Sequence, residues 1–239
     1  MNSADITRQQ LCGMIDHTCL KPYADHAMLE QLCSEAEENH FAMVAINSSP
    51  VAFCMEILKR TGVHVGAAIS FPLGQTTIET KVYETENAIQ NGADEIDYVI
   101  NIGEVKNGNF AYIEKEMEQM VQTCRKAGAV CKVIFENCYL TKEEIRRVAQ
   151  IAAKVRPDYI KTSTGFGTGG AEPADIRLMK AASGGVVKVK AAGGIRSWEA
   201  CKKMIDAGAD RIGTSSSLKI LQEYDEEKEG KKRDETGNQ

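Results

Sequence analysis

Eight short β-rich runs alternate with longer amphipathic segments along almost the whole chain. They cover Met14–His17, Ala42–Ile46, His64–Ile69, Glu95–Ile100, Val130–Phe135, Asp158–Lys161, Val186–Lys190 and Arg211–Ile212. These runs are too apolar to leave one face in water, so they predict a parallel sheet that is covered by helices. Eight such units in 239 residues fit one closed (β/α)8 barrel, for which roughly 250 residues is typical.

Signals for helix ends fall between these runs. Thr141-Lys-Glu-Glu144 has the form of a capping box, and Gly128 follows an apolar stripe as a C-cap would. Pro173 suits a first helical turn, and Ser197 suits an N-cap. We therefore expect helices over Asp25–Asn39, Thr76–Gln90, Phe110–Ala127, Thr141–Val155, Glu172–Ala182 and Trp198–Ala207.

The fold class that follows is α/β, and two arrangements are open: a closed barrel or an open doubly wound sheet. No Gly-x-Gly-x-x-Gly motif follows the first strand, which weakens the dinucleotide-binding form of the open sheet. We predict a single TIM barrel over residues 1–222, with an extra N-terminal helix. Residues 223–239 are mostly charged, and we expect the last helix to fray there into a flexible tail.

Composition excludes several classes of partner. The net charge of −5 argues against nonspecific nucleic-acid binding, which needs clustered Lys and Arg. No apolar run approaches the roughly 18 to 20 residues of a membrane-spanning helix, and the first ten residues are too polar for a signal peptide. The eight cysteines form no CxxC pair and have no His cluster at zinc-finger spacing. We expect a cytoplasmic protein with reduced thiols and no metal site.

Charged residues stand at the carboxyl ends of several predicted strands, where a barrel enzyme keeps its chemistry. They are Asp16, Asp97, Lys161 and Lys190. A lone lysine at such a place is ordinarily a solvated charge, but Lys161 and Lys190 both follow apolar runs and precede glycine-rich loops. Alternation places Lys188 and Lys190 on one face of their strand, and Lys190 is the one that adjoins the glycines.

Two neighbouring lysines suggest a nucleophile that attacks a carbonyl. Such a lysine must be neutral, so working near pH 7 requires its pKa to fall by about 3 units from about 10.4, or about 4–5 kcal/mol. A second cation about 5 Å away supplies roughly 3 kcal/mol at an effective dielectric of 20. Partial burial supplies the rest. Asp97 would move protons during imine and enamine formation, with a purely structural partnership to a lysine as the alternative.

Three consecutive loops near the end of the chain are rich in small residues. They are Thr164-Gly-Phe-Gly-Thr-Gly-Gly170, Ala192-Gly-Gly-Ile-Arg-Ser197 and Gly213-Thr-Ser-Ser-Ser217. Glycine lets backbone N–H groups approach an anion, and barrels often bind phosphate after strands seven and eight. These loops predict a phosphate pocket, although tight turns alone would also explain the glycines. Arg196 is either a further phosphate ligand or a surface residue.

The collected motifs resemble those of the deoxyribose-phosphate aldolase family, in order and across nearly the whole chain. They are Ile15-Asp-His-Thr-Cys-Leu-Lys-Pro22, Gly92-Ala-Asp-Glu-Ile-Asp-Tyr-Val-Ile-Asn-Ile-Gly103, Lys161-Thr-Ser-Thr-Gly-Phe166, Lys190-Ala-Ala-Gly-Gly-Ile-Arg196 and Arg211-Ile-Gly-Thr-Ser-Ser216. The resemblance implies reversible cleavage of 2-deoxy-D-ribose 5-phosphate to acetaldehyde and D-glyceraldehyde 3-phosphate. It also implies no cofactor or metal, a role in deoxynucleoside breakdown, and a homodimer.

By matching positions, the resemblance implies that Lys161 forms the imine, that Lys190 lowers its pKa and that Asp97 relays protons. Asp16 would support the polar network around the substrate. The implied phosphate-binding residues are Gly165, Phe166, Gly193, Gly194, Ser215 and Ser216.

The chain departs from the family pattern at several positions. Ala45 stands where many relatives carry cysteine, and Ser48 replaces a common proline. Phe166 stands where some members place a lysine near the phosphate. The chain ends in Gln239 after a charged stretch, whereas some relatives end in a tyrosine that reaches the site.

Other readings stay open from sequence. One is a Schiff-base aldolase that prefers a different sugar phosphate, and another is a noncatalytic barrel that binds a phosphorylated metabolite. The roles of Glu136 and Asn137, which follow the fifth predicted strand, are also open.

Overall fold

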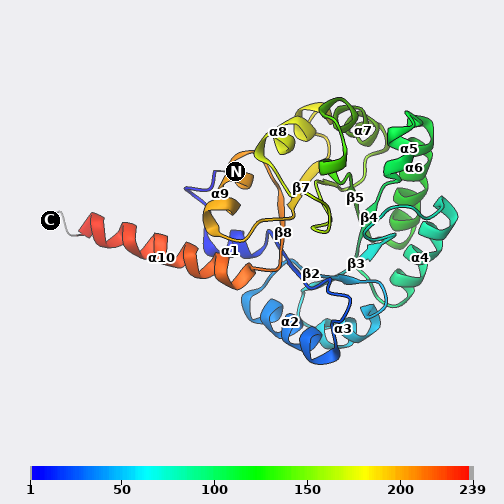
Figure 1. Ribbon diagram of the computed structural model, residues 1–239. Coiled ribbons are helices and arrows are strands. Elements are labelled where there is room, and N and C mark those ends of the chain that lie inside the picture. The colour runs from blue at the N-terminus through cyan, green and yellow to red at the C-terminus, as the bar shows by residue number, and fades with distance from the viewer. Residues whose placement is uncertain (1, 237–239) are drawn as a thin grey trace.

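The computed structural model describes the backbone of residues 2–236 and the side chains of residues 2–230; the chain end at Gln239 lies outside the described residues. Eight strands form the centre of the molecule (Figure 1). They are β1 (Ile15–Thr18), β2 (Met43–Asn47), β3 (His64–Ile69), β4 (Glu95–Val99), β5 (Val130–Ile134), β6 (Tyr159–Lys161), β7 (Lys188–Ala192) and β8 (Arg211–Thr214). Neighbours pair in parallel and in sequence order, and β1 also pairs with β8. The ring is closed, which confirms the barrel and excludes the open sheet.

Helices surround this ring (Figure 1). They are α1 (Arg8–Cys12), α2 (His26–Asn39), α3 (Val51–Leu58), α4 (Ile78–Gln90), α5 (Ile102–Lys106), α6 (Phe110–Ala127), α7 (Lys142–Val155), α8 (Pro173–Ala182), α9 (Trp198–Asp206) and α10 (Ser217–Thr236), with a 3₁₀ turn η1 (Asn137–Tyr139). The predicted N-terminal helix is α1. Within residues 2–236, no helix is both long and apolar enough to cross a bilayer.

The expected helix ends are confirmed. Thr141 and Glu144 form a reciprocal capping box, and Gly128 ends α6 in the left-handed region with a φ of 73°. Pro173 occupies the first turn of α8, and the Ser197 side chain accepts a hydrogen bond from the Ala200 amide at the start of α9.

Alternation along the strands separates two environments. Ile96 and Tyr98 of β4 belong to the apolar layer between sheet and helices, together with Val133 of β5. The residues that alternate with them along the same strands, Asp97 in β4 and Lys132 in β5, are buried inside the ring. The apolar layer stabilises the fold, while the barrel interior holds charged side chains.

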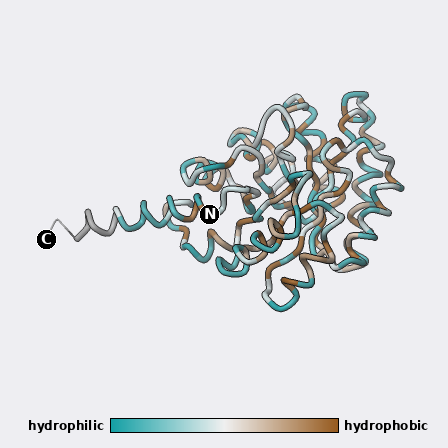
Figure 2. Tube along the Cα trace, turned by 60° about the horizontal axis from the view of Figure 1, so that its bottom comes forward, coloured by the Kyte–Doolittle hydropathy of each residue, from teal (hydrophilic) through white to brown (hydrophobic). Residues whose placement is uncertain are grey.

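Several element boundaries shift by one or two residues from the prediction, and the start of β7 and the chain end differ in ways that affect the interpretation. The seventh strand begins at Lys188 rather than Val186, because Gly184 and Gly185 both have positive φ and delay the first ladder pair to Tyr159 and Lys188. The segment expected to fray continues as α10 to Thr236 and extends away from the barrel, and its described part is mostly hydrophilic (Figure 2). Flexibility of residues 223–239 stays a prediction.

Candidate active site

Three lysines converge on the carboxylate of Asp97 inside the barrel. Asp97 Oδ2 accepts from Lys161 Nζ at 2.7 Å and from Lys190 Nζ at 2.6 Å, while Oδ1 accepts from Lys132 Nζ at 2.7 Å. Strand register explains the meeting, because Asp97 lies opposite Lys132 and Lys161 lies opposite Lys190. Lys161 and Lys190 share one oxygen, so their nitrogens lie within two hydrogen-bond lengths of each other.

A second layer of charge lies against this cluster. Asp16 is fully buried and forms ion pairs with Lys190 and with Arg211 Nε, the latter at 2.8 Å. These contacts lack aligned hydrogen-bond geometry. Arg211 Nη2 also donates to both oxygens of Glu95, at 2.6 and 2.8 Å, and Lys132 pairs with Glu95. Asp16 therefore holds Lys190 and Arg211 in place and does not line the cavity above them.

The pKa of Lys161 is lowered to about 8. Burial is the largest cause, since only 4% of the residue is exposed and a buried ammonium loses its hydration. The carboxylate of Asp97 opposes this shift, whereas the nearby charges of Lys190 and Lys132 add to it. The predicted cation beside Lys161 is present, although burial contributes more than the charge.

Asp97 stays ionised although it is buried. Burial alone would raise its pKa, but Lys132, Lys161 and Lys190 outweigh burial and hold the pKa well below its usual range. Burial likewise disfavours the charge on Lys132, and the carboxylates of Asp97, Glu95 and Asp16 reverse that effect and raise its pKa. The cluster is therefore a compensated set of charges.

Lys132, Glu95 and Arg211 were not singled out from sequence. They lie within or at the start of strands, where a charged residue is easily assigned to a solvated strand end. The available signal is alternation: in Val130-Cys-Lys-Val-Ile134, Lys132 stands between Cys131 and Val133, which face the apolar layer. Pairing of β4 with β5 then brings Lys132 Nζ to 2.7 Å from Asp97 Oδ1.

Glu136 and Asn137 support the segment that follows Lys161. The Glu136 carboxylate accepts from the Thr164 amide at 3.1 Å and from the Thr164 hydroxyl. Glu136 is buried and has a φ of 56°, a left-handed conformation that is uncommon outside glycine. Burial raises its pKa. The Asn137 amide donates to the Thr162 carbonyl at 2.9 Å, so the turn at η1 fixes the backbone of residues 162–164.

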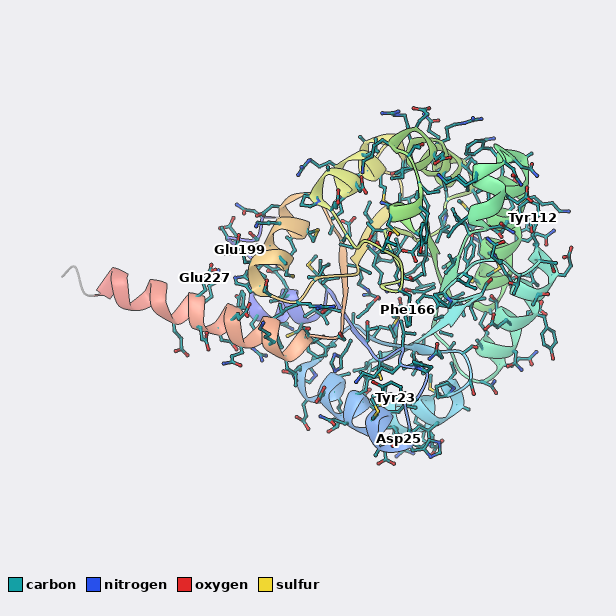
Figure 3. All side chains as sticks on the ribbon, viewed as in Figure 1. Tyr23, Asp25, Tyr112, Phe166, Glu199 and Glu227 are labelled. Atoms are coloured by element: carbon teal, nitrogen blue, oxygen red, sulfur yellow. The ribbon has the colours of Figure 1, made fainter. Side chains whose placement is uncertain are left out.

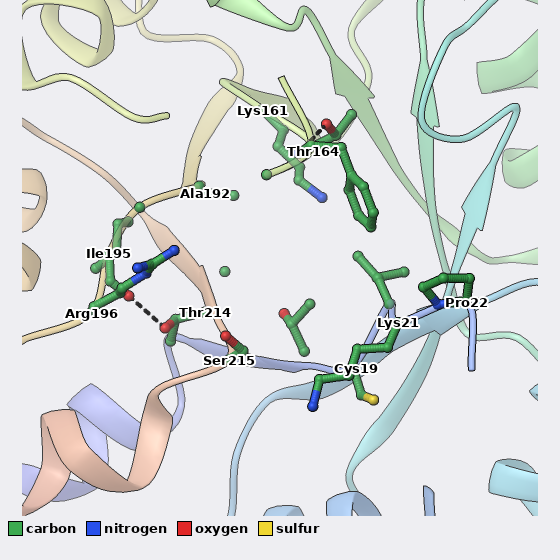
Figure 4. A pocket seen from close by; sticks show the side chains of 17 residues that line it. Cys19, Lys21, Pro22, Lys161, Thr164, Ala192, Ile195, Arg196, Thr214 and Ser215 are labelled. Atoms are coloured by element: carbon green, nitrogen blue, oxygen red, sulfur yellow. Dashed lines mark hydrogen bonds between the residues drawn. The ribbon is translucent and has the colours of Figure 1, made fainter. Parts of the chain in front are cut away.

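A cavity of about 280 Å³ opens above the lysine cluster. Lys161 points its amino group into it, and the loops after β6, β7 and β8 form one side (Figure 4). Gly165, Phe166, Gly193, Gly194 and Ser215 line the cavity. Thr18, Cys19, Lys21 and Arg196 also line it, so the wall contains two cations that sequence analysis left unassigned or open.

Of the phosphate-binding candidates, Ser216 lies just outside the set of cavity-lining residues, and its amide donates to Thr214 Oγ1 at 2.9 Å. Gly193 has a φ of 88°, and a Cβ there would meet Gly170 Cα at 3.1 Å, so glycine is required by both conformation and space. Gly194 has a φ of 75° but open space around it. The loops pack closely at Gly193 and leave Gly194 free to face an anion.

Phe166 lies over the middle of the barrel mouth and is 53% exposed (Figure 3). Its ring meets Phe71 edge-on at a centroid distance of 5.5 Å. It lines the lysine cavity on one side and a groove of about 260 Å³ on the other, which Leu73 and Tyr139 also line. Phe166 therefore forms an apolar rim of the cavity and carries no charge for a phosphate.

Comparison with known proteins gives a consistent result. Residues 12–223 match the model of the DeoC/LacD family aldolases. The chain is 55% identical to the deoxyribose-phosphate aldolase of Lactobacillus acidophilus, over 90% of this chain and 91% of that protein. It is 51% identical to the enzyme of the same name from Bacteroides thetaiotaomicron, over 95% of each chain. The deoxyribose phosphate aldolase structure from Aeropyrum pernix superposes with a TM-score of 0.85 at 29% identity, covering 92% of each chain.

Proposed function

Because this chain belongs to the DeoC/LacD family of aldolases, we propose that it reversibly cleaves 2-deoxy-D-ribose 5-phosphate through an imine on Lys161. The observation that carries the proposal is the buried amine of Lys161 with its pKa lowered to about 8, at the floor of a cavity walled by glycine-rich loops. A buried lysine beside other cations is an established form of activated amine nucleophile. The substrate follows from the names of the relatives.

In the proposed reaction, neutral Lys161 attacks the aldehyde carbon of the open-chain sugar and forms a carbinolamine. Loss of water gives a protonated imine, which draws electrons as the bond between C2 and C3 breaks. The hydroxyl on C3 loses its proton, D-glyceraldehyde 3-phosphate leaves, and an enamine remains on Lys161. Protonation of the enamine at C2 and hydrolysis release acetaldehyde and restore the amine.

Asp97 and Lys190 divide the proton handling. The Asp97 carboxylate accepts from Lys161 at 2.7 Å, so it is placed to receive hydrogen bonds from the carbinolamine and from an intervening water. Because its pKa lies well below the usual range, the Asp97 carboxylate is a weak base, so it passes a proton on through hydrogen bonds and does not stay protonated. Lys190, on the same oxygen, keeps positive charge beside the amine and favours the neutral form of Lys161.

The phosphate would lie at the opposite end of the cavity from the amine. Backbone N–H groups at Gly193, Gly194 and Ser215 supply donors there, and Arg196 supplies charge. Ser216 does not line the cavity, so it would contribute only by holding the loop at the start of α10. Phe166, which adds no charge, would bound the sugar instead of binding the phosphate.

The test is reductive trapping. The folded protein is treated with acetaldehyde and borohydride, and the modified peptide is identified by mass spectrometry, with Lys161→Ala and Lys188→Ala as paired variants. We expect a two-carbon adduct on Lys161 that Lys161→Ala abolishes and Lys188→Ala retains. An adduct on Lys190 would exchange the two lysine roles, and no adduct on any lysine would overturn the mechanism and favour a noncatalytic metabolite-binding barrel.

A substrate panel separates the proposed reaction from that of a related aldolase. Cleavage of a fructose phosphate without cleavage of deoxyribose 5-phosphate would indicate a different sugar preference. The expected homodimer, cytoplasmic location and independence from metal also stay predictions. Mass measurement in solution and activity after chelation test the first and last. The Aeropyrum pernix protein is described as tetrameric.

A further inference from the structure

A relay of three side chains, two buried and one half-buried, lies outside the ring of strands, between β1, α2 and the start of α10. His17 Nε2 lies 2.7 Å from Glu35 Oε2, and His17 Nδ1 lies 2.8 Å from Ser217 Oγ. His17 is 4% exposed and Ser217 is fully buried. None of the three lines the lysine cavity. The relay therefore has no part in the covalent chemistry.

Glu35 determines which ring nitrogen of His17 carries the proton. An ionised carboxylate only accepts hydrogen bonds, so Nε2 of His17 carries the proton and donates to Glu35. The other oxygen of Glu35 already accepts from Gln31 Nε2 at 2.8 Å. In the neutral imidazole Nδ1 is then an acceptor, and the Ser217 hydroxyl donates to it. The competing acceptor for Ser217, the Thr214 carbonyl, is farther away at 3.4 Å.

Ser217 is the residue that follows the last phosphate loop. The loop is held at its first end by Thr214, whose Oγ1 donates to the Ile195 carbonyl at 2.7 Å and accepts from the Ser216 amide at 2.9 Å. His17 holds the other end through Ser217. Residues 215 and 216 are thus fixed between two buried contacts.

His17 also stands between two strand residues that belong to the site. Asp16 pairs with Lys190 below the cavity, and Thr18 lines the cavity itself. One imidazole therefore connects the strand beneath the amine to the helix start beneath the phosphate loop. An ordinary buried histidine would fill space between helices, whereas this one has both ring nitrogens in hydrogen bonds, one to α2 and one to the start of α10.

We propose that His17 is a positioning residue for the phosphate end of the substrate. Its hydrogen bond to Ser217 sets the first turn of α10 relative to β1, so that Ser215, which lines the cavity, presents its backbone N–H to the anion. The inference rests on the proposed function, because it presumes a phosphorylated sugar in the cavity. Glu35 acts one step further out, by fixing the tautomer of His17.

Two substitutions separate the two ring nitrogens. His17→Asn keeps a polar atom near the Nδ1 position and can still accept from Ser217. His17→Gln reaches toward the Nε2 position and loses the Ser217 contact. The readout is kcat/KM for deoxyribose 5-phosphate divided by kcat/KM for unphosphorylated deoxyribose, and His26→Gln, an exposed histidine of the neighbouring α2, is the control.

We expect His17→Gln to lower this ratio by about tenfold, the loss for one hydrogen bond of about 1.4 kcal/mol, while His17→Asn recovers most of it. Ser217→Ala should reproduce the loss, and the double variant His17→Gln/Ser217→Ala should be no worse than either single variant. Ser217→Ala keeps the test available if His17→Gln fails to fold.

Other outcomes overturn the proposal. The first is an equal loss of kcat/KM on the phosphorylated and the unphosphorylated sugar. The second is the same fall of the kcat/KM ratio in His17→Asn as in His17→Gln. The third is a double variant whose loss equals the sum of the losses in His17→Gln and Ser217→Ala. A parent enzyme that cleaves neither deoxyribose sugar would instead refute the proposed function, so the two failures are distinguishable.

Discussion

Replacing Lys190 with methionine isolates the contribution of one charge to the nucleophile. Lys190 and Lys161 share Asp97 Oδ2, at 2.6 and 2.7 Å, so the removed charge lies about 5 Å from the amine. At an effective dielectric of about 20, such a repulsion is worth about 3 kcal/mol, or about 2 pKa units. The pKa of Lys161 should therefore rise from about 8 toward about 10.

The direction of the pH effect follows from the reactive form. Only the neutral amine attacks a carbonyl, so the rate falls about tenfold for each pH unit below the pKa of Lys161. With a pKa of about 8, one amine in about ten is neutral at pH 7. In Lys190→Met that fraction should fall about a hundredfold, and Asp97, now less neutralised, would pull the pKa further in the same direction.

The assay is the rate of borohydride trapping with acetaldehyde between pH 6 and pH 10.5. The control is Lys188→Met, which removes a lysine from the same strand but at its exposed end. We expect the acid limb to shift upward by about 2 units in Lys190→Met and to stay in place in Lys188→Met. A shift below about half a unit in Lys190→Met, from protein that melts normally, would refute the assigned electrostatic role.

Three further predictions concern the surroundings of the amine. Lys132→Met takes one buried cation from Asp97 and Glu95, which keep other cationic partners but lose part of the compensation for their burial. It should lower the free energy of unfolding by about 3–5 kcal/mol in urea titrations, whereas the exposed ion pair lost in Lys106→Met should cost less than about 1 kcal/mol. Gly193→Ala should raise KM for the phosphorylated sugar more than Gly194→Ala, because both have positive φ but only the first also meets backbone; equal KM values would contradict this reasoning. Glu136→Gln should lower kcat/KM roughly tenfold by weakening one of the two contacts to Thr164, and an unchanged kcat/KM would show that the turn needs no carboxylate.

Much of this site is predictable from sequence because its charged residues belong to predicted strands of one barrel. Lys161 and Lys190 follow short apolar runs and precede glycine-rich loops, whereas Asp97 and Lys190 lie in the middle of the observed strands β4 and β7 rather than at their ends. The phosphate loops are predictable for a related reason, since glycine marks places where backbone must turn sharply or approach an anion.

The rest of the site depends on contacts between strands that the linear sequence does not show. Lys132 meets Asp97 only when β4 and β5 pair in register, and Arg211 meets Asp16 only when β8 pairs with β1 across the closed ring. A local sequence pattern does not reveal these partners. Glu136 is visible in the sequence at a strand end, but its role stays open there because its left-handed turn uses neither glycine nor asparagine. The late start of the seventh strand was missed because Val186 has strong β propensity, while the two glycines before it decide the local geometry.

The pairing of β1 with β8 has a consequence for the order of folding. Asp16 lies near one end of the chain, and its partners Lys190 and Arg211 lie near the other. Until β8 docks, burial of these groups would leave unpaired charges in a poorly hydrated interior, at a cost of several kcal/mol per ion. A chain in which the ring has not closed would therefore keep this interior hydrated, and Lys161 would keep its ordinary, higher pKa there. On this reasoning, the amine becomes a nucleophile near neutral pH only once β8 pairs with β1.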